Sequence, residues 1–312
     1  MPMRLLRINA RIAQPRLPSS RTDPVGANTR IKKVWRKTEG KFNLIREQVL
    51  ELFNAIPVVQ NNAQDEYGYT YDFNATRAAT FSEQIQRILD DILLEDTTSG
   101  QMWMGVEVED AYQSGMQQAQ GNLAKISMAY AEQRSMADIL YSEPYLNRLG
   151  VAYAGTYSDW QGLSDQARQQ LASVITEGIA NGKAPGSVTD DIVARVGVTE
   201  SKARQMAQTE ITGALRQARR DEAQEAKALL GLNVGIFWTS ALLKTTRSWH
   251  ASRHGNVYAP KEVAEFYAKN GNRYNCHCGN TECIIYDGKP QITERVRALY
   301  AAEKAKWQSE DK

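Results

Sequence analysis

Hydrophobic residues recur with helical spacing near the start of the chain. The spacing alternates between four and three residues at Ile31, Trp35, Thr38, Phe42, Ile45, Val49, Leu52 and Ile56. Because seven of these eight residues are apolar, they predict one buried seam on a helix. Asn28 or Thr29 can cap this helix, and Pro57 ends it. We expect it to pack on a second helix of similar pattern rather than to form a free coiled coil.

That second helix is indicated by the spacing of Phe81, Ile85, Ile88 and Ile92. Between the two helices, the alternation of residues 67–73 suits a short strand or a hairpin. Residues 105–141 have helical character, with Gly115 and Gly121 at points where helices could pack closely or bend. This whole region has the character of a scaffold.

Residues beyond 141 predict further helices separated by breaks. Residues 142–144 interrupt the helical pattern, and residues 150–163 are expected to form a loop. A helix is expected from Leu163 to Asn181, followed by a short one through residues 192–196. Thr199 is expected to cap a long helix over residues 200–230, which Gly231 ends.

The composition changes past Gly231. Residues 234–239 have strand character, residues 260–269 predict a helix, and residues 283–286 could form a closing strand. The fold class expected is therefore mainly α, with a small C-terminal α+β module. Because such a module has only a small core, we expect a bound zinc ion to stabilise its fold. The expected division is a basic disordered or extended arm (1–28), a helical domain (29–160), a second helical part (161–232), the α+β module (233–290) and a charged helix (291–312).

Several protein classes are disfavoured by composition. The hydrophobic fraction of 42% is ordinary for a globular protein, and no apolar run of about 18 residues indicates a transmembrane helix. The first residues lack the apolar stretch and cleavage site of a signal peptide. Three cysteines are too few for a disulfide-stapled secreted protein of this length, so a reducing cytoplasm is expected.

Positive charge is concentrated at the N-terminus. The first 41 residues carry eleven Lys or Arg and two acids, whereas the whole chain has a net charge of only +2. Such an arm could contact DNA phosphates, or it could dock on an acidic protein surface or keep the chain soluble. Because no aromatic residue precedes Trp35, stacking on bases is not expected. The candidate contact residues are Arg4, Arg7, Arg11, Arg16, Arg21, Lys32, Lys33, Arg36 and Lys37.

All histidines and cysteines of the chain fall between residues 250 and 283. His250 and His254 have the spacing of one helical turn, which suits chelation, and Cys276 and Cys278 add two thiolates. These four side chains are a zinc ligand set, in which Cys283 is the alternative to His254. His277 is expected to point away. The alternative is a set of buried free cysteines beside hydrogen-bonded histidines.

The order of several short motifs over residues 163–288 resembles the Mu F-like minor head proteins, also called the phage head morphogenesis domain. The motifs are Gly178-Ile179-Ala180-Asn181-Gly182, Ile192-Val193, Ala203-Arg204-Gln205-Met206-Ala207-Gln208-Thr209-Glu210, Gly231, Trp238, Arg247-x-x-His250, Gly255 and Asn275-Cys276-x-Cys278. The chain departs from the family pattern in two places. His254 stands where an acid or Asn is common, and His277 where Arg is common between the cysteines.

The resemblance implies a minor protein of a tailed-phage head, located in the virion and, during assembly, in the host cytoplasm. The implied partners are the portal protein, other capsid components and packaged double-stranded DNA, with no membrane and no small-molecule substrate. Within the resembling region, Glu210 could pair with Arg247 or orient His250 as a carboxylate partner. A solvated helix face is the alternative for Glu210.

An enzyme is the competing interpretation. A zinc ion with an open position could support nuclease-like chemistry, with Asp287 or Glu282 as a base, or the chain could be a toxin-associated enzyme. The sequence lacks a glycine-rich phosphate loop, a Ser/His/Asp order and an H-E-x-x-H motif. We therefore expect no catalytic residues and no enzymatic activity.

Overall fold

The computed structural model describes residues 14–62, 68–95 and 101–310. The chain divides into two compact units. The bundle unit comprises Thr29–Glu109 and Leu149–Glu210, and the sheet unit comprises Met1–Asn28, Asp110–Arg148 and Ile211–Lys312. Three long helices have residues in both units: α3 (Trp103–Ile126), α6 (Glu143–Ala180) and α7 (Pro185–Leu230).

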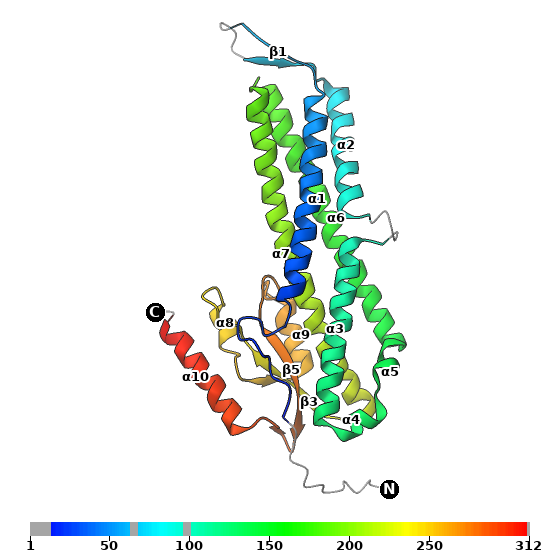
Figure 1. Ribbon diagram of the computed structural model, residues 1–312, viewed down its shortest axis with the longest axis vertical. Coiled ribbons are helices and arrows are strands. Elements are labelled where there is room, and N and C mark those ends of the chain that lie inside the picture. Colours follow the sequence, from blue (N-terminus) through cyan, green and yellow to red (C-terminus); the bar gives the residue numbers. More distant parts are fainter. Residues whose placement is uncertain (1–13, 63–67, 96–100, 311–312) are drawn as a thin grey trace. The chain divides into compact units, whose positions relative to one another are not determined.

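The bundle unit is built on helix α1 (Asn28–Asn54), which runs beside α2 (Ala75–Leu93) (Figure 1). The hydrophobic seam predicted for α1 is confirmed in its centre, where Thr38, Phe42, Ile45 and Val49 are buried. Towards the ends, Val34 and Phe53 are buried in place of Trp35 and Leu52, because a straight helix drifts from a strict seven-residue repeat. Thr38 satisfies its buried hydroxyl by donating to the carbonyl of Val34.

A hairpin separates α1 from α2, as predicted. Strand β1 (Val58–Gln60) pairs antiparallel with β2 (Tyr69–Tyr71), and Val59 lies opposite Thr70. The Asn74 side chain caps α2 by accepting a hydrogen bond from the Arg77 amide. The buried side chains of α2 include Phe81, Ile85 and Ile92 of the predicted seam, together with Leu89.

Two predictions for the later helices were wrong. Residues 150–163 do not form a loop but lie inside α6, which begins at Glu143 with Pro144 in its first turn, where a missing N–H costs no hydrogen bond. Thr199 does not cap a helix: it lies inside α7 and donates to the carbonyl of Arg195. The sequence did not predict this continuity because the packing of buried side chains along each helix outweighs the low local helix propensity of single residues.

The sheet unit contains four antiparallel strands in the order β4-β3-β5-β6. Strands β3 (Val234–Thr239) and β5 (Gly279–Tyr286) form its centre, with Phe237 opposite Thr281. The flanking strands are β4 (Val257–Tyr258) and β6 (Lys289–Pro290). Besides the parts of the three long helices, the described residues of the sheet unit form five shorter helices: α4 (Met128–Gln133), α5 (Met136–Leu140), α8 (Ser248–Ala251), α9 (Pro260–Ala268) and α10 (Glu294–Glu310). A mainly helical chain with a small C-terminal sheet is therefore confirmed.

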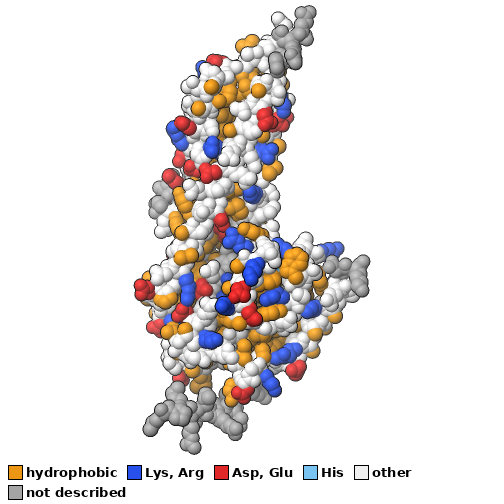
Figure 2. Space-filling model, turned by 180° about the vertical axis from the view of Figure 1, so that it is seen from behind, with side chains coloured by type: hydrophobic (Ala, Val, Ile, Leu, Met, Phe, Trp, Pro, Cys, Tyr) orange, Lys and Arg blue, Asp and Glu red, His pale blue; other side chains and the backbone are white. Residues whose placement is uncertain are grey.

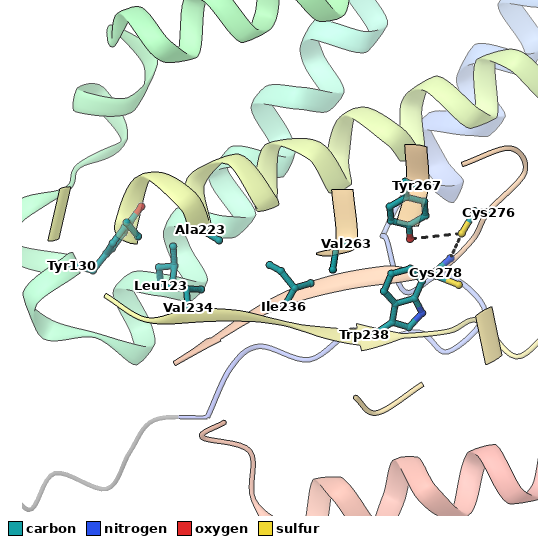
Figure 3. Packing of buried hydrophobic residues seen from close by; sticks show 11 residues of the cluster. Leu123, Tyr130, Ala223, Val234, Ile236, Trp238, Val263, Tyr267, Cys276 and Cys278 are labelled. Carbon is teal, nitrogen blue, oxygen red and sulfur yellow. Dashed lines mark hydrogen bonds between the residues drawn. The ribbon is translucent and has the colours of Figure 1, made fainter. Parts of the chain in front are cut away.

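Both faces of this sheet are covered. On one face, Val234, Ile236 and Trp238 of β3 pack against α3, α7 and α9 (Figure 3). On the other face, Phe237 and Cys283 pack with Ile292 and Tyr300, and Leu17 from the N-terminal segment joins them. The strand alternation that puts successive side chains on opposite faces thus supplies two small cores instead of one.

The described part of the basic N-terminal segment lies on the sheet unit. The Arg16 amide donates to the Asn122 side chain over 2.7 Å, and the Arg21 guanidinium pairs with Glu303 over 2.9 Å. Gly279 allows the segment to approach β5, because a Cβ there would lie 2.4 Å from the carbonyl oxygen of Pro24. No helix in the described residues has the length and hydropathy needed to cross a bilayer.

Gly115 is expected to be required where α3 meets α7. A Cβ at this position would lie 2.5 Å from the Leu215 carbonyl oxygen. We predict that Gly115→Ala lowers the free energy of unfolding by about 1–3 kcal/mol through overpacking. Gly121→Ala is the matched control on α3, since its Cβ meets only Arg16 at 3.8 Å, and it should be neutral or stabilising. Equal denaturation midpoints for the two variants would contradict the close approach.

Candidate metal centre

Two loops of the sheet unit bring soft ligands together. His250 lies on the short helix α8, which follows β3, and Cys276 and Cys278 lie on the loop that enters β5. This second loop turns sharply at Asn270, Gly271 and Asn275, all with positive φ. Because β3 and β5 are hydrogen-bonded neighbours, the end of one and the start of the other place the two loops side by side.

The three side chains form a compact, buried cluster. The ligand atoms of His250, Cys276 and Cys278 all lie within 4.8 Å of one another. Nδ1 of His250 lies 3.4 Å from Sγ of Cys276 and 3.6 Å from Sγ of Cys278. In a tetrahedral zinc site with ordinary bond lengths, a sulfur and a nitrogen ligand are about 3.5 Å apart. The spacing therefore fits a zinc ion, and the residues are only 2–4% exposed.

The far side of the His250 ring is held by the same loop that carries the cysteines. Its Nε2 lies 3.4 Å from the Asn272 side-chain oxygen and 3.2 Å from the Arg247 guanidinium. Arg247 also donates to the main-chain carbonyls of Asn272 and Tyr274, the latter over 2.6 Å. Arg247 thus connects the two loops beside the ring.

Glu210, predicted either to pair with Arg247 or to orient His250, lies in the bundle unit. Its carboxylate accepts a hydrogen bond from the indole N–H of Trp160 over 3.3 Å. The pairing of Glu210 with Arg247 stays a prediction.

Sequence reasoning missed Arg216, a fully buried cation beside the cluster. Its guanidinium donates to the main-chain carbonyls of Cys276 and Cys278 over 2.8 and 3.3 Å. It also lies over the ring of Tyr267, whose hydroxyl is 3.8 Å from Sγ of Cys276. The only available signal was an arginine on the apolar side of the long helix α7, and an arginine at such a position is usually exposed.

The surroundings shift the pKa values of the two cysteine thiols in opposite directions. Burial alone would raise the pKa of Cys276, but the hydrogen bond from Cys278 and the charge of Arg216 hold that pKa well below its usual value. Burial and the neighbouring Cys276 instead raise the pKa of Cys278 well above its usual value. Without a metal, the surroundings therefore favour the thiolate more at Cys276 than at Cys278, and a bound cation would favour the thiolate at both.

His254 and Cys283 lie outside the cluster. His254 Nδ1 accepts a hydrogen bond from the Ser240 amide, and its Nε2 lies 3.2 Å from a Glu303 oxygen. Both ring nitrogens are thus engaged outside the cluster, Nδ1 by the Ser240 amide and Nε2 by Glu303 of α10. Cys283 is packed on the opposite face of the sheet with Phe237 and Tyr300. Among the described His, Cys, Asp and Glu residues, only His250, Cys276 and Cys278 form such a group.

The predicted basic contact residues are divided among several environments. Arg4, Arg7 and Arg11 lie outside the described residues, and Arg16 and Arg21 lie on the sheet unit. Lys33 and Lys37 on α1 both pair with the buried Glu107. Lys32 and Arg36 on α1 are exposed. The charges of Arg21, Lys33 and Lys37 are therefore paired within the fold.

Comparison with known proteins gives one match. Residues 169–281 match the family model described as phage Mu protein F like protein, and this region includes His250, Cys276 and Cys278. The resemblance seen in the sequence is thereby confirmed over that region. No curated protein and no solved structure gave a significant match.

We predict that zinc binding depends on three of the five candidate ligands. Single substitutions His250→Ala, Cys276→Ala and Cys278→Ala should abolish stoichiometric zinc binding measured by titration with a chromogenic chelator. His254→Gln and Cys283→Ala should retain it, because their side chains lie outside the cluster. Loss of zinc from either of the last two variants would return that residue to the ligand set.

The docking of α10 by His254 predicts a pH dependence of stability. Burial, and then the charges of Arg21 and Lys304, lower the pKa of His254 from 6.5 to about 4. Between these values the unfolded chain binds one more proton than the folded chain, so stability falls as pH falls. From pH 6.5 to 5, the wild type should lose up to about 2 kcal/mol more than His254→Gln. Urea titrations of both proteins at the two pH values measure this difference. The same loss of unfolding free energy in the wild type and in His254→Gln would contradict a neutral buried imidazole.

Proposed function

We propose that this protein is a minor structural component of a phage head, acting in head morphogenesis. The observation that carries the proposal is the match of residues 169–281 to the phage Mu protein F like family. The family-level resemblance supports a head morphogenesis protein, located in the virion after assembly in the host cytoplasm. The portal vertex or the capsid interior is the proposed position.

We further propose that the C-terminal module holds a structural zinc ion. His250, Cys276 and Cys278 would bind it, and the spacing of their ligand atoms supports a tetrahedral ion. When bound, zinc would cross-link two loops that otherwise rely on a small core, and so contribute directly to folding. Burial of all three ligands to 2–4% exposure supports a structural role, since a catalytic ion needs an accessible position.

A zinc-dependent nuclease or a toxin-associated enzyme is less well supported. Glu282, a candidate base, is fully buried and accepts two hydrogen bonds from the Arg219 guanidinium, over 2.8 and 2.7 Å. Asn122 donates to the same carboxylate over 2.8 Å. A carboxylate held in this way stabilises the fold and is poorly placed to accept a proton from water. We propose that the protein acts without catalysis.

The proposed partners are the portal protein and other capsid components, with packaged double-stranded DNA as a further contact of the basic N-terminal region. Exposed Lys32 and Arg36 support some contact with a polyanion. Figure 2 shows one face of the molecule, on which hydrophobic side chains are interspersed with charged ones.

Quantitative mass spectrometry of phage particles tests the proposed function. We expect a few copies of the chain per particle in both DNA-filled particles and empty precursor heads. Capsid and tail proteins of known copy number supply the internal standard. Presence in precursors alone would redefine the protein as an assembly factor that leaves, and absence from both would contradict the head-protein proposal.

A further inference from the structure

We infer that the Tyr267 hydroxyl supplies the fourth donor of the metal centre, giving a site of two cysteines, one histidine and one tyrosine. This inference rests on the proposed zinc centre and identifies the donor that completes it. Neither His254 nor Cys283 can take this position without rearrangement, because the first has both ring nitrogens engaged elsewhere and the second lies on the opposite face of the sheet.

Geometry is the first observation in favour of Tyr267. Its oxygen lies 3.8 Å from Sγ of Cys276, and it comes from α9, an element that contributes no other ligand. A sulfur and an oxygen on the same tetrahedral zinc ion are about 3.6 Å apart. Figure 3 shows the hydroxyl directed at the Cys276 sulfur, with Cys278 beside them. The separation between the Tyr267 oxygen and the Cys276 sulfur is therefore compatible with both atoms binding one ion.

The position of the Tyr267 ring is tightly fixed. The ring stacks on Trp238, with centroids 5.3 Å apart and planes 18° from parallel. The Arg216 guanidinium lies 4.5 Å from the ring centroid, and the Arg220 guanidinium lies 5.6 Å from it. A ring held in this way keeps its hydroxyl at the cluster at little further entropic cost.

Charge balance is the second observation. Arg216 is 1% exposed, and its hydrogen bonds within the described residues go to two carbonyls and the Thr212 hydroxyl, none of which is charged. A divalent ion with two thiolates is neutral, which would leave the buried charge of Arg216 uncompensated. A phenolate as fourth ligand adds one negative charge and makes the centre and Arg216 neutral together. A water molecule or a neutral side chain in that position would not.

The experiment is zinc titration of the metal-free full-length chain, followed by ultraviolet difference spectroscopy. Zinc should generate one tyrosinate absorption band per chain in the wild type. Tyr267→Phe should lack the band and bind zinc more than about 100-fold more weakly, which exceeds the 10–100-fold cost of losing a hydrogen-bonding partner of a ligand. A competing chelator of known affinity measures the binding, and circular dichroism in excess zinc checks that the variant is folded.

Tyr258→Phe is the matched control, because Tyr258 also packs on Trp238 but its hydroxyl contacts Asn256. It should keep both the band and the affinity. Zinc binding by the wild type without a tyrosinate band would overturn the inference while leaving the zinc centre intact, as would a loss of affinity below about 10-fold in Tyr267→Phe. Failure of the wild type to bind zinc would overturn the inference and the proposed zinc centre together.

Discussion

The fold of the sheet unit depends on bringing a buried cation and two buried cysteines together between two loops. Arg216 is fully buried on α7 and donates to the carbonyls of both cysteines, so it fixes the loop that enters β5. Burial of this guanidinium is costly unless negative charge lies nearby, and thiolates are the available source. The side chain that positions the cysteines therefore also favours the form in which cysteines bind metals.

The same long helix makes further buried polar contacts within the sheet unit. Arg219 pairs with Glu282 of β5, and Glu222 accepts hydrogen bonds from Tyr130 and Arg134. Removing one partner of such a pair leaves a buried charge, so the Arg219–Glu282 pair specifies how α7 lies on the sheet, and the Glu222 contacts specify how α7 lies against α4. With α7 fixed, β5 and its preceding loop have little freedom, and the ligand cluster is formed at a defined place.

Much of the helical architecture could be predicted from sequence because apolar spacing reports a buried face directly. The seam centred on Phe42 and Val49 and the strands through Ile236 and Cys283 were found in this way. The continuity of α6 through residues 150–163 and of α7 through Thr199 could not, since the glycines Gly150, Gly155 and Gly162 and Thr199, of a residue type common at helix caps, have the local character of breaks. Within the site, ligand types marked His250, Cys276 and Cys278, but spacing alone could not separate them from His254, whose ring faces Glu303. Arg216 and Tyr267 were missed because only tertiary packing brings α7 and α9 to the cysteine loop.

The most direct test of a metal-organised module is amide hydrogen exchange of the full-length chain with and without a zinc chelator. If zinc holds the two loops together, chelation should speed exchange in β3, β5 and the loops around His250 and Cys276, while α1 and α2 of the bundle unit keep their protection. Unchanged exchange throughout the sheet unit would show that packing and the buried Arg216 contacts are sufficient, and would contradict a stabilising role for the metal.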